Sequence, residues 1–240
     1  MRADGSAAER LARADAATGG EGAVSLEWRD TAAILAVNTM SGADTITRID
    51  AAFDEIVART GTKLIIDLRR NTGGAFAVRT LIGHLIRTPL DAGVFVSRLW
   101  YAGHDAEPLP SDWTSAAPWT GYSVREFLPF MLARPLTAHR IEPLRPHFAG
   151  RVYVLTSARS LSAAEIAADA MRAGCGATII GEQTPGAVLS SKRFDIAGGF
   201  HLIVPVADYY SISSGRLEGA GVAPDISVAA EQALEIALAS

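Results

Sequence analysis

Ser162 is the first residue whose type and position could support chemistry. It follows an apolar run at 150–156 that predicts a buried strand, and it begins a stretch of small residues that predicts a helix. A serine in the first turn of a helix can act as a nucleophile, and the backbone N–H of Ala163 can stabilise an oxyanion beside it. Glu165 lies one turn further on the same helix face. Ser162 and Glu165 also fit a capping box, so both interpretations stay open.

Gly73 and Gly74 form a second candidate. They follow an apolar run at 63–68, which predicts a buried strand, and they precede a predicted helix at 75–86. Backbone N–H groups at a helix N-terminus have no partner within the helix and carry partial positive charge, so a glycine corner there can hold an oxyanion. An ordinary turn, in which the glycines only satisfy the backbone geometry, is the alternative.

Four segments, in this order along the chain, resemble the motifs of one family. They are DLRRNTGG at 67–74, VYVLTS at 152–157 with SAAE at 162–165, ATIIGEQTPG at 177–186, and EGAGVAPDI at 218–226. The family is the S41 serine peptidases, which includes C-terminal processing (tail-specific) proteases, tricorn-like proteases and interphotoreceptor retinoid-binding protein modules. The resemblance extends over roughly 24–228.

The resemblance implies a ClpP/crotonase-like α/β core and hydrolysis of peptide bonds through an acyl-enzyme. Carried over to this sequence, it makes Ser162 the nucleophile. The oxyanion hole would then be formed by the backbone N–H groups of Ala163 and of Gly73 or Gly74. The retinoid-binding relatives imply that the same fold can also serve binding without catalysis. The alternative function is therefore a non-catalytic module that binds a peptide or an apolar ligand.

The resemblance assigns two acidic residues but does not find the general base. Glu165 matches the helix-borne acid beside the nucleophile, and Glu218 matches the acidic residue that helps orient the base in the tricorn-like branch. In the tail-specific branch a lysine directly follows the glycine of the GExTxG motif, and Ala187 stands at that position here. Lys192, five residues further on, could serve as base only if its loop folds back.

The tricorn-like branch instead takes a histidine from sequence before the core sheet. The first histidine of this chain is His84, and His104 is the best of the histidines that follow. Two hypotheses account for the absence of a general base: the base lies on an N-terminal domain outside this chain, or the protein has abandoned catalysis. We therefore expect weak activity from the chain in isolation.

The elements that must position these residues alternate between strand and helix. Strands are predicted at 24–28, 32–37, 63–68, 94–96, 150–156, 177–181, 194–196 and 202–206, and helices at 44–60, 75–86, 162–172 and 229–238. The order predicts an α/β fold with parallel crossovers and a mixed sheet. We expect a disordered or frayed segment at 1–23 and one core domain at 24–240. Within it, 102–148 is rich in proline and aromatic residues, which suggests an insertion or lid.

Composition excludes several classes of partner. The chain has 240 residues, a formal net charge of −4 and an isoelectric point near 5.7, with no basic stripe, so nucleic acid is not expected. No run reaches the roughly 18 to 20 apolar residues of a membrane span, and no apolar signal region begins the chain. A single cysteine, Cys175, excludes a cysteine-rich zinc site. We expect no cofactor, a polypeptide substrate, and either a further N-terminal domain or a second copy as partner; no compartment is predicted.

Overall fold

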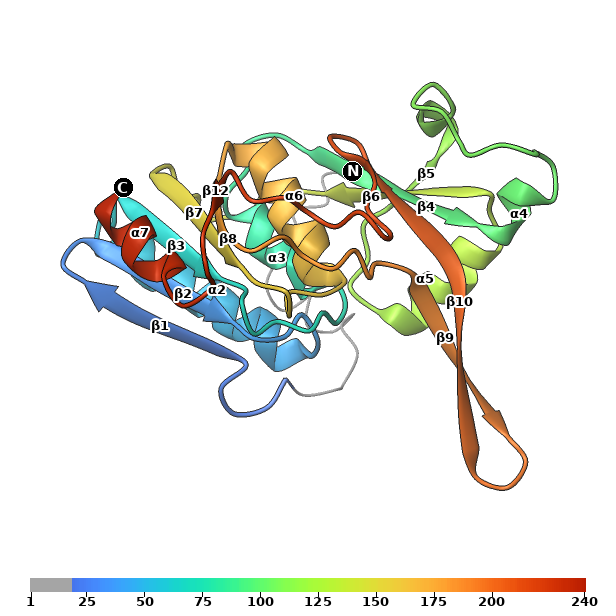
Figure 1. The fold of residues 1–240 in the computed structure, drawn as a ribbon, viewed down its shortest axis with the longest axis horizontal. Helices are drawn as coiled ribbons and strands as arrows, with labels where there is room; N and C mark the ends of the chain where they lie inside the picture. Colours follow the sequence, from blue (N-terminus) through green and yellow to red (C-terminus); the bar gives the residue numbers. More distant parts are fainter. Residues whose placement is uncertain (1–18) are drawn as a thin grey trace.

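The computed structural model describes residues 19–240, so most of the segment expected to be frayed at 1–23 lies outside the described residues. Two six-stranded sheets, with helices packed between and around them, make up the described part (Figure 1). No helix of the described residues has the length and apolar character needed to cross a membrane.

The first sheet carries the predicted strands of the core. Its order is β1 (Val24–Arg29), β2 (Ala32–Val37), β3 (Lys63–Asp67), β7 (Arg151–Thr156), β8 (Thr178–Gly181) and β12 (Ile226–Ser227). Only the β1–β2 pair is antiparallel among these neighbours. Because β3 and β7 are parallel, with Asp67 paired to Leu155, their carboxyl ends meet at one edge of the sheet. The two segments singled out for chemistry follow these two ends.

Helices cover both faces of this sheet. The helices α2 (Ala43–Ala58), α3 (Ala77–Gly83) and α6 (Ala163–Cys175) share one apolar cluster with the sheet, whereas α7 (Ala233–Ala239) packs on the residues of the opposite face. The helix predicted at 44–60, α2, buries one face, with Ile49, Phe53 and Ile56 fully inaccessible. The predicted helix at 75–86 is shorter in the structure, because it begins after Phe76 and ends at Gly83.

The second sheet combines strands predicted at 94–96, 194–196 and 202–206 with strands from the segment expected to be an insertion or lid. Its order is β11 (Gly215–Arg216), β10 (Phe200–Ser211), β4 (Leu90–Ser97), β6 (Leu136–Ile141) and β5 (Ala117–Trp119), with β9 (Ser190–Ile196) paired to β10. The segment 102–148 supplies β5, β6, a 3-10 turn at Asp112–Ser115 and the helix α5 (Val124–Leu132). A short helix, α4 (Arg98–Tyr101), precedes this segment. The strand β6 lies between β4 and β5, so the second sheet depends on this segment.

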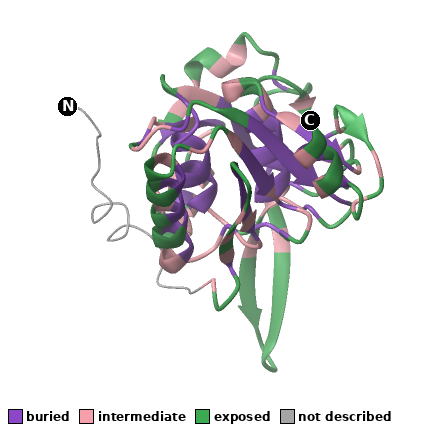
Figure 2. Ribbon diagram, turned by 90° about the vertical axis from the view of Figure 1, so that its left-hand side faces the viewer, coloured by how far each residue is buried: buried purple, intermediate pink, exposed green. Residues whose placement is uncertain are grey.

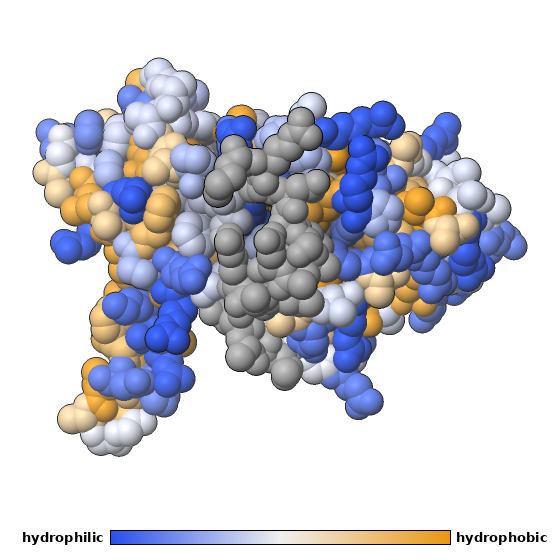
Figure 3. Space-filling model, turned by 180° about the vertical axis from the view of Figure 1, so that it is seen from behind, coloured by the Kyte–Doolittle hydropathy of each residue, from blue (hydrophilic) through white to orange (hydrophobic). Residues whose placement is uncertain are grey.

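The strands predicted at 194–196 and 202–206 pair as a hairpin around Gly198-Gly199, and both are longer than expected. Its two strands, β9 and the first part of β10, project from the body as an arm (Figure 1). Most of the arm is exposed, as Figure 2 shows. Apolar and hydrophilic residues lie side by side on its surface (Figure 3), and Phe200 and Ile203 are among the exposed apolar ones.

Asp169 of α6 connects the two sheets through hydrogen bonds. Its carboxylate is buried and accepts hydrogen bonds from the hydroxyl groups of Ser211, Ser213 and Ser214, at the end of β10 and in the turn that follows. The guanidinium of Arg172 lies 3.2 Å from the same carboxylate. Because three donors converge on one buried charge, this contact fixes how β10 sits on α6.

We expect Asp169→Ala to lower the free energy of unfolding by about 2 to 3 kcal/mol, because hydrogen bonds to a buried charge are lost together. Urea denaturation followed by circular dichroism measures the change. Asp195→Ala is the matched control: Asp195 also pairs with neighbouring side chains, but on the exposed arm, and the change there should stay within about 0.5 kcal/mol. Equal effects of the two substitutions would contradict this role of Asp169.

Candidate active site

Ser162 sits in a sharp turn between β7 and α6. Its backbone has φ 54° and ψ −115°, a left-handed conformation that residues with a side chain rarely adopt. Such a conformation costs about 1 to 3 kcal/mol and persists only where the surrounding structure holds it. Ser162 and the next residue, Ala163, both line a cavity between the two sheets.

Hydrogen bonds tie the turn before Ser162 to the loop after β3. The hydroxyl of Ser160 donates to the carbonyl of Leu68 over 2.8 Å, and the N–H of Leu161 donates to the carbonyl of Asn71 over 3.0 Å. The hydroxyl of Ser157 donates to the carbonyl of Arg69. The two loops therefore form one rigid unit at the edge of the first sheet.

The structure brings the glycine corner against Ser162. A side chain on Gly73, which has φ 99°, would come within 2.8 Å of the Ser162 Cβ, so glycine alone fits there. The N–H of Gly73 donates to the Asn71 side-chain oxygen over 2.8 Å. Within residues 19–240, the N–H groups of Gly74 and Ala163 donate no hydrogen bond. Gly74 and Ala163 therefore keep free donors at the cavity, whereas the donor of Gly73 is already engaged.

Glu165 holds Ser162 in place. Its buried carboxylate accepts hydrogen bonds from the Ser162 N–H at 2.8 Å and the Ala187 N–H at 2.9 Å through one oxygen. The other oxygen accepts from the Thr184 hydroxyl at 2.7 Å and the Gly186 N–H at 2.6 Å. An ionised carboxylate has about four acceptor positions, and these four donors occupy them. The capping box expected from the sequence is present, and Ser162 faces the cavity as well, so the two interpretations are compatible.

Glu218 makes no hydrogen bond to Ser162 in the described structure and instead contacts the cavity wall. One of its carboxylate oxygens accepts hydrogen bonds from the N–H groups of Val188 and Leu189, at 2.7 and 3.1 Å. Both of these residues line the cavity, whereas Glu218 itself does not. Glu218 thus fixes the wall of the cavity through its backbone.

The two side chains considered as bases lie outside the cavity lining. The Lys192 ammonium group stands 5.0 Å from the ring centroid of Phe194, on the arm. The ring of His104 stacks on Trp100 with centroids 3.7 Å apart, after α4. The structure therefore joins Ser162 with Ala163, Gly74 and Glu165, but it does not bring Lys192 or His104 to them.

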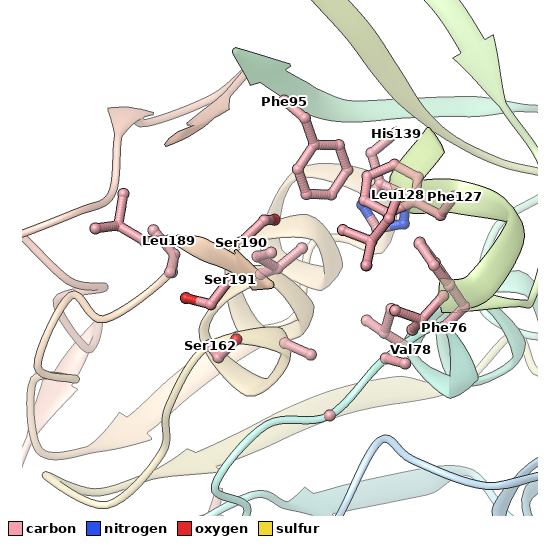
Figure 4. Close-up of a pocket in the computed structure, with 16 residues that line it drawn as sticks. Phe76, Val78, Phe95, Phe127, Leu128, His139, Ser162, Leu189, Ser190 and Ser191 are labelled. Atoms are coloured by element: carbon pink, nitrogen blue, oxygen red, sulfur yellow. The ribbon is translucent and has the colours of Figure 1, made fainter. Parts of the chain in front are cut away.

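The cavity has a volume of about 260 Å³ and a largely apolar wall (Figure 4). Its apolar side chains are Ala75, Phe76, Val78, Phe95, Val124, Phe127, Leu128, Ala163, Ile166, Val188 and Leu189. Figure 4 shows the aromatic side chains gathered on one side, around His139, and Ser162 on another. His139 comes from β6 and is 1% exposed. Neither of its ring nitrogens has a hydrogen-bond partner among the described residues.

Sequence reasoning missed His139, because it lies in the segment that looked like an insertion. The apolar and β-branched residues at 136–141 are the pattern that could have predicted a strand there. Burial, and secondarily the positive charge of Arg79, lowers the pKa of His139 to about 3. The imidazole is therefore neutral near pH 7 and a poor proton acceptor.

Comparison with known proteins agrees with this geometry. The sequence profile of Peptidase family S41 matches residues 31–228. The chain belongs to peptidase family S41. A carboxyl-terminal-processing peptidase 1 from the chloroplast of Arabidopsis thaliana is 28% identical over 81 residues, which are 34% of this S41 chain and 17% of that protein.

Solved structures share the fold. The photosystem II D1 C-terminal processing protease superimposes with a TM-score of 0.62 at 19% identity, covering 88% of this S41 chain and 49% of that one. Mature CPAF gives 0.60 at 16% identity, covering 88% and 50%. This S41 chain thus spans about half the length of these relatives. The likeness confirms the predicted α/β fold with mixed sheets.

No group of three or more His, Cys, Asp or Glu side chains in residues 19–240 is placed to share a metal ion. What the arrangement offers is a strained serine, two free N–H donors and an apolar cavity. These are the parts that acyl transfer requires apart from a base.

The low pKa of His139 predicts a pH dependence of stability. Between its usual value of 6.5 and about 3, the unfolded chain binds a proton that the folded chain does not. Stability should therefore fall as the pH is lowered from 6.5, by up to about 1.4 kcal/mol per pH unit from this group. Urea denaturation at pH 7 and at pH 5 should show a smaller decrease for His139→Phe than for the unchanged chain. The control is His104→Phe, outside the cavity; identical pH dependence in all three proteins would contradict the burial of a neutral His139.

Proposed function

We propose that this S41 chain is a serine-type endopeptidase domain that hydrolyses peptide bonds through an acyl-enzyme on Ser162. The observation that carries the proposal is the strained Ser162 at the cavity, next to the free N–H groups of Gly74 and Ala163. Family membership supports it, because this arrangement lies in the segments that resemble the S41 motifs. The activity is a proposal, since the chain spans only part of its relatives' length.

In the first step the Ser162 hydroxyl oxygen attacks the substrate carbonyl carbon and its proton passes to a base. The oxyanion that forms accepts hydrogen bonds from the N–H groups of Gly74 and Ala163. Gly74 is preferred to Gly73, because the Gly73 N–H already donates to Asn71. The tetrahedral intermediate then expels the amine, which takes a proton, and water later releases the acyl group from Ser162.

Glu165 and Glu218 act as positioning residues in this proposal. Glu165 sets the backbone of Ser162, and Glu218 sets the cavity wall at Val188 and Leu189. Neither is needed to transfer a proton, because each carboxylate is engaged by backbone N–H donors. Lys192 is not assigned as the base, because its ammonium group packs against Phe194 on the arm.

The base is proposed to come from outside the cavity. His139 is the one titratable side chain among the described residues that line it, and its pKa of about 3 makes it unsuitable. A further domain or a second copy of the chain would supply the base, so activity of the chain alone would be weak.

The substrate is proposed to be an extended polypeptide paired along β9. This strand has β10 as its single partner within the described structure, so its other edge has unpaired backbone groups. Ser190 and Ser191, at the start of β9, line the cavity beside Ser162. An extended peptide added to this edge would therefore lead to the nucleophile.

Labelling with a fluorophosphonate tests the nucleophile. We expect slow covalent labelling of the purified chain, detected by intact-protein mass spectrometry, because the oxyanion donors are present and the base is not. Ser162→Ala should abolish labelling, and Ser191→Ala, which changes another serine of the cavity, should retain it. Labelling that survives in Ser162→Ala would refute this nucleophile. A folded chain that never reacts would favour the non-catalytic binding module.

Ala187→Lys tests whether the missing base limits the reaction. The Ala187 and Ser162 N–H groups donate to the same oxygen of Glu165, so the two residues lie close together, and Ala187 is exposed. The tail-specific branch, which this segment resembles, has a lysine there. We expect labelling of Ser162 to accelerate about 100-fold, in line with a general base, and to rise with pH.

Ala187→Met is the matched control, because methionine has a similar length and no amine. Equal labelling rates for the lysine and methionine variants would show that the base is not what limits Ser162.

A further inference from the structure

We propose that the cavity beside Ser162 selects a tyrosine-like side chain, an aromatic ring that ends in a neutral hydroxyl group, through a hydrogen bond to His139. The inference rests on the proposed peptidase function, because it names the substrate side chain that the same site would accept. It concerns the wall of the cavity around His139, which takes no part in bond cleavage.

The size of the cavity suits one large side chain. Its volume of about 260 Å³ is below the range of about 300 to 1,000 Å³ that is typical of pockets for small-molecule ligands. The rings of Phe76 and Phe95 each meet Phe127 edge to face, with centroids 5.0 and 4.8 Å apart. A substrate ring can extend this cluster, because aromatic rings favour such tilted contacts.

His139 gives this apolar cavity a polar end. Its ring lies 6.0 Å from Phe76 and 5.6 Å from Phe95, centroid to centroid, and both of its nitrogens lack partners within the described residues. Buried polar atoms are rarely left unpaired, because losing water without replacement costs free energy. A neutral imidazole has one donor and one acceptor nitrogen, and a phenol hydroxyl can satisfy either.

The charge of Arg79 affects which substrate side chains the cavity can accept. Its side chain is 2% exposed, donates to the carbonyl of Gly121 over 2.6 Å, and lies over the ring of Tyr122, with the guanidinium carbon 4.8 Å from the ring centroid. Its positive charge lies near enough to lower the pKa of His139. A lysine or arginine side chain would be repelled by this charge. A carboxylate would be attracted by this charge, but it would lose its hydration in an apolar cavity that no described cationic side chain lines, so a neutral tip fits best.

Tyr209 is the other titratable group that faces His139, with ring centroids 6.3 Å apart. Its hydroxyl is buried and also unpartnered within residues 19–240, and its pKa is raised by burial, so it stays neutral. It does not line the cavity. The side chains around His139 therefore offer hydrogen-bonding groups, and no described carboxylate lines the cavity, which is the setting that a phenol requires.

The first experiment measures how tightly small side-chain analogues, rather than peptides, bind to the cavity. p-Cresol and toluene, the side-chain analogues of tyrosine and phenylalanine, are titrated into the purified chain and followed by the NMR shifts of cavity methyl groups. We expect the ratio of the toluene to the p-cresol dissociation constant to fall about tenfold in His139→Phe, the size of one hydrogen bond. His104→Phe, on the Trp100 stack, should leave the ratio unchanged.

A second measurement uses the unchanged chain, in case His139→Phe does not fold. p-Cresol should shift the ring nitrogen resonances of His139 through the new hydrogen bond, and toluene should shift them much less. Equal shifts with the two ligands, or an unchanged ratio in a folded His139→Phe, would overturn the inference. Fluorophosphonate labelling of Ser162 would still stand in that case, so the two failures are distinguishable.

The third measurement tests the inference with peptide substrates. Peptides that differ only by tyrosine or phenylalanine before the scissile bond are titrated into Ser162→Ala by calorimetry. We expect the tyrosine peptide to bind about tenfold more tightly, and the difference to vanish when His139→Phe is added. Selectivity for p-cresol without selectivity among peptides would overturn the substrate assignment. Failure of both peptides to bind would overturn the proposed peptidase function along with it.

Discussion

The carboxylate of Glu165 is the interaction on which the rest of the site depends. It is fully buried, and four donors from two separate segments converge on it. A buried carboxylate is costly unless such donors satisfy it, so the segments are held where they can reach it. One of those donors belongs to Ser162, whose left-handed backbone would relax if the carboxylate did not fix it. The first turn of α6 and the loop at 184–187 therefore form one structure.

The parallel sheet supplies the second constraint. Because β3 and β7 are neighbours with the same direction, the corner at Gly73 and Gly74 and the turn at Ser162 leave the sheet at the same edge. The absence of a side chain on Gly73 lets the two turns approach, and its N–H is used by Asn71 to hold the corner. The donor that remains free is that of Gly74. The position of the proposed oxyanion hole thus follows from sheet topology combined with one local hydrogen bond.

Local patterns predicted the core well, because its elements depend on local sequence. The helix expected at 44–60 is α2 at 43–58, and the strand expected at 63–68 is β3. The sequence of the segment at 102–148 instead suggests an insertion or lid. Its strand β6 is stabilised by pairing with β4, from the sequence before the segment, and prolines around it resemble those of a loop. His139 was missed with it, and the choice between Gly73 and Gly74 required a side-chain hydrogen bond that no spacing reveals.

The same burial that makes His139 suitable for recognition makes it unsuitable as a base. A general base needs a pKa near the working pH, and the aromatic wall around His139 lowers its pKa far below that. Recognition of a neutral group instead requires an imidazole that stays uncharged. In the proposed mechanism the base would approach Ser162 from the exposed side, at Ala187, where the backbone is held by Glu165. A lysine at this position or a histidine from a proposed further domain would use the same approach, so one rigid loop could serve either source of the base.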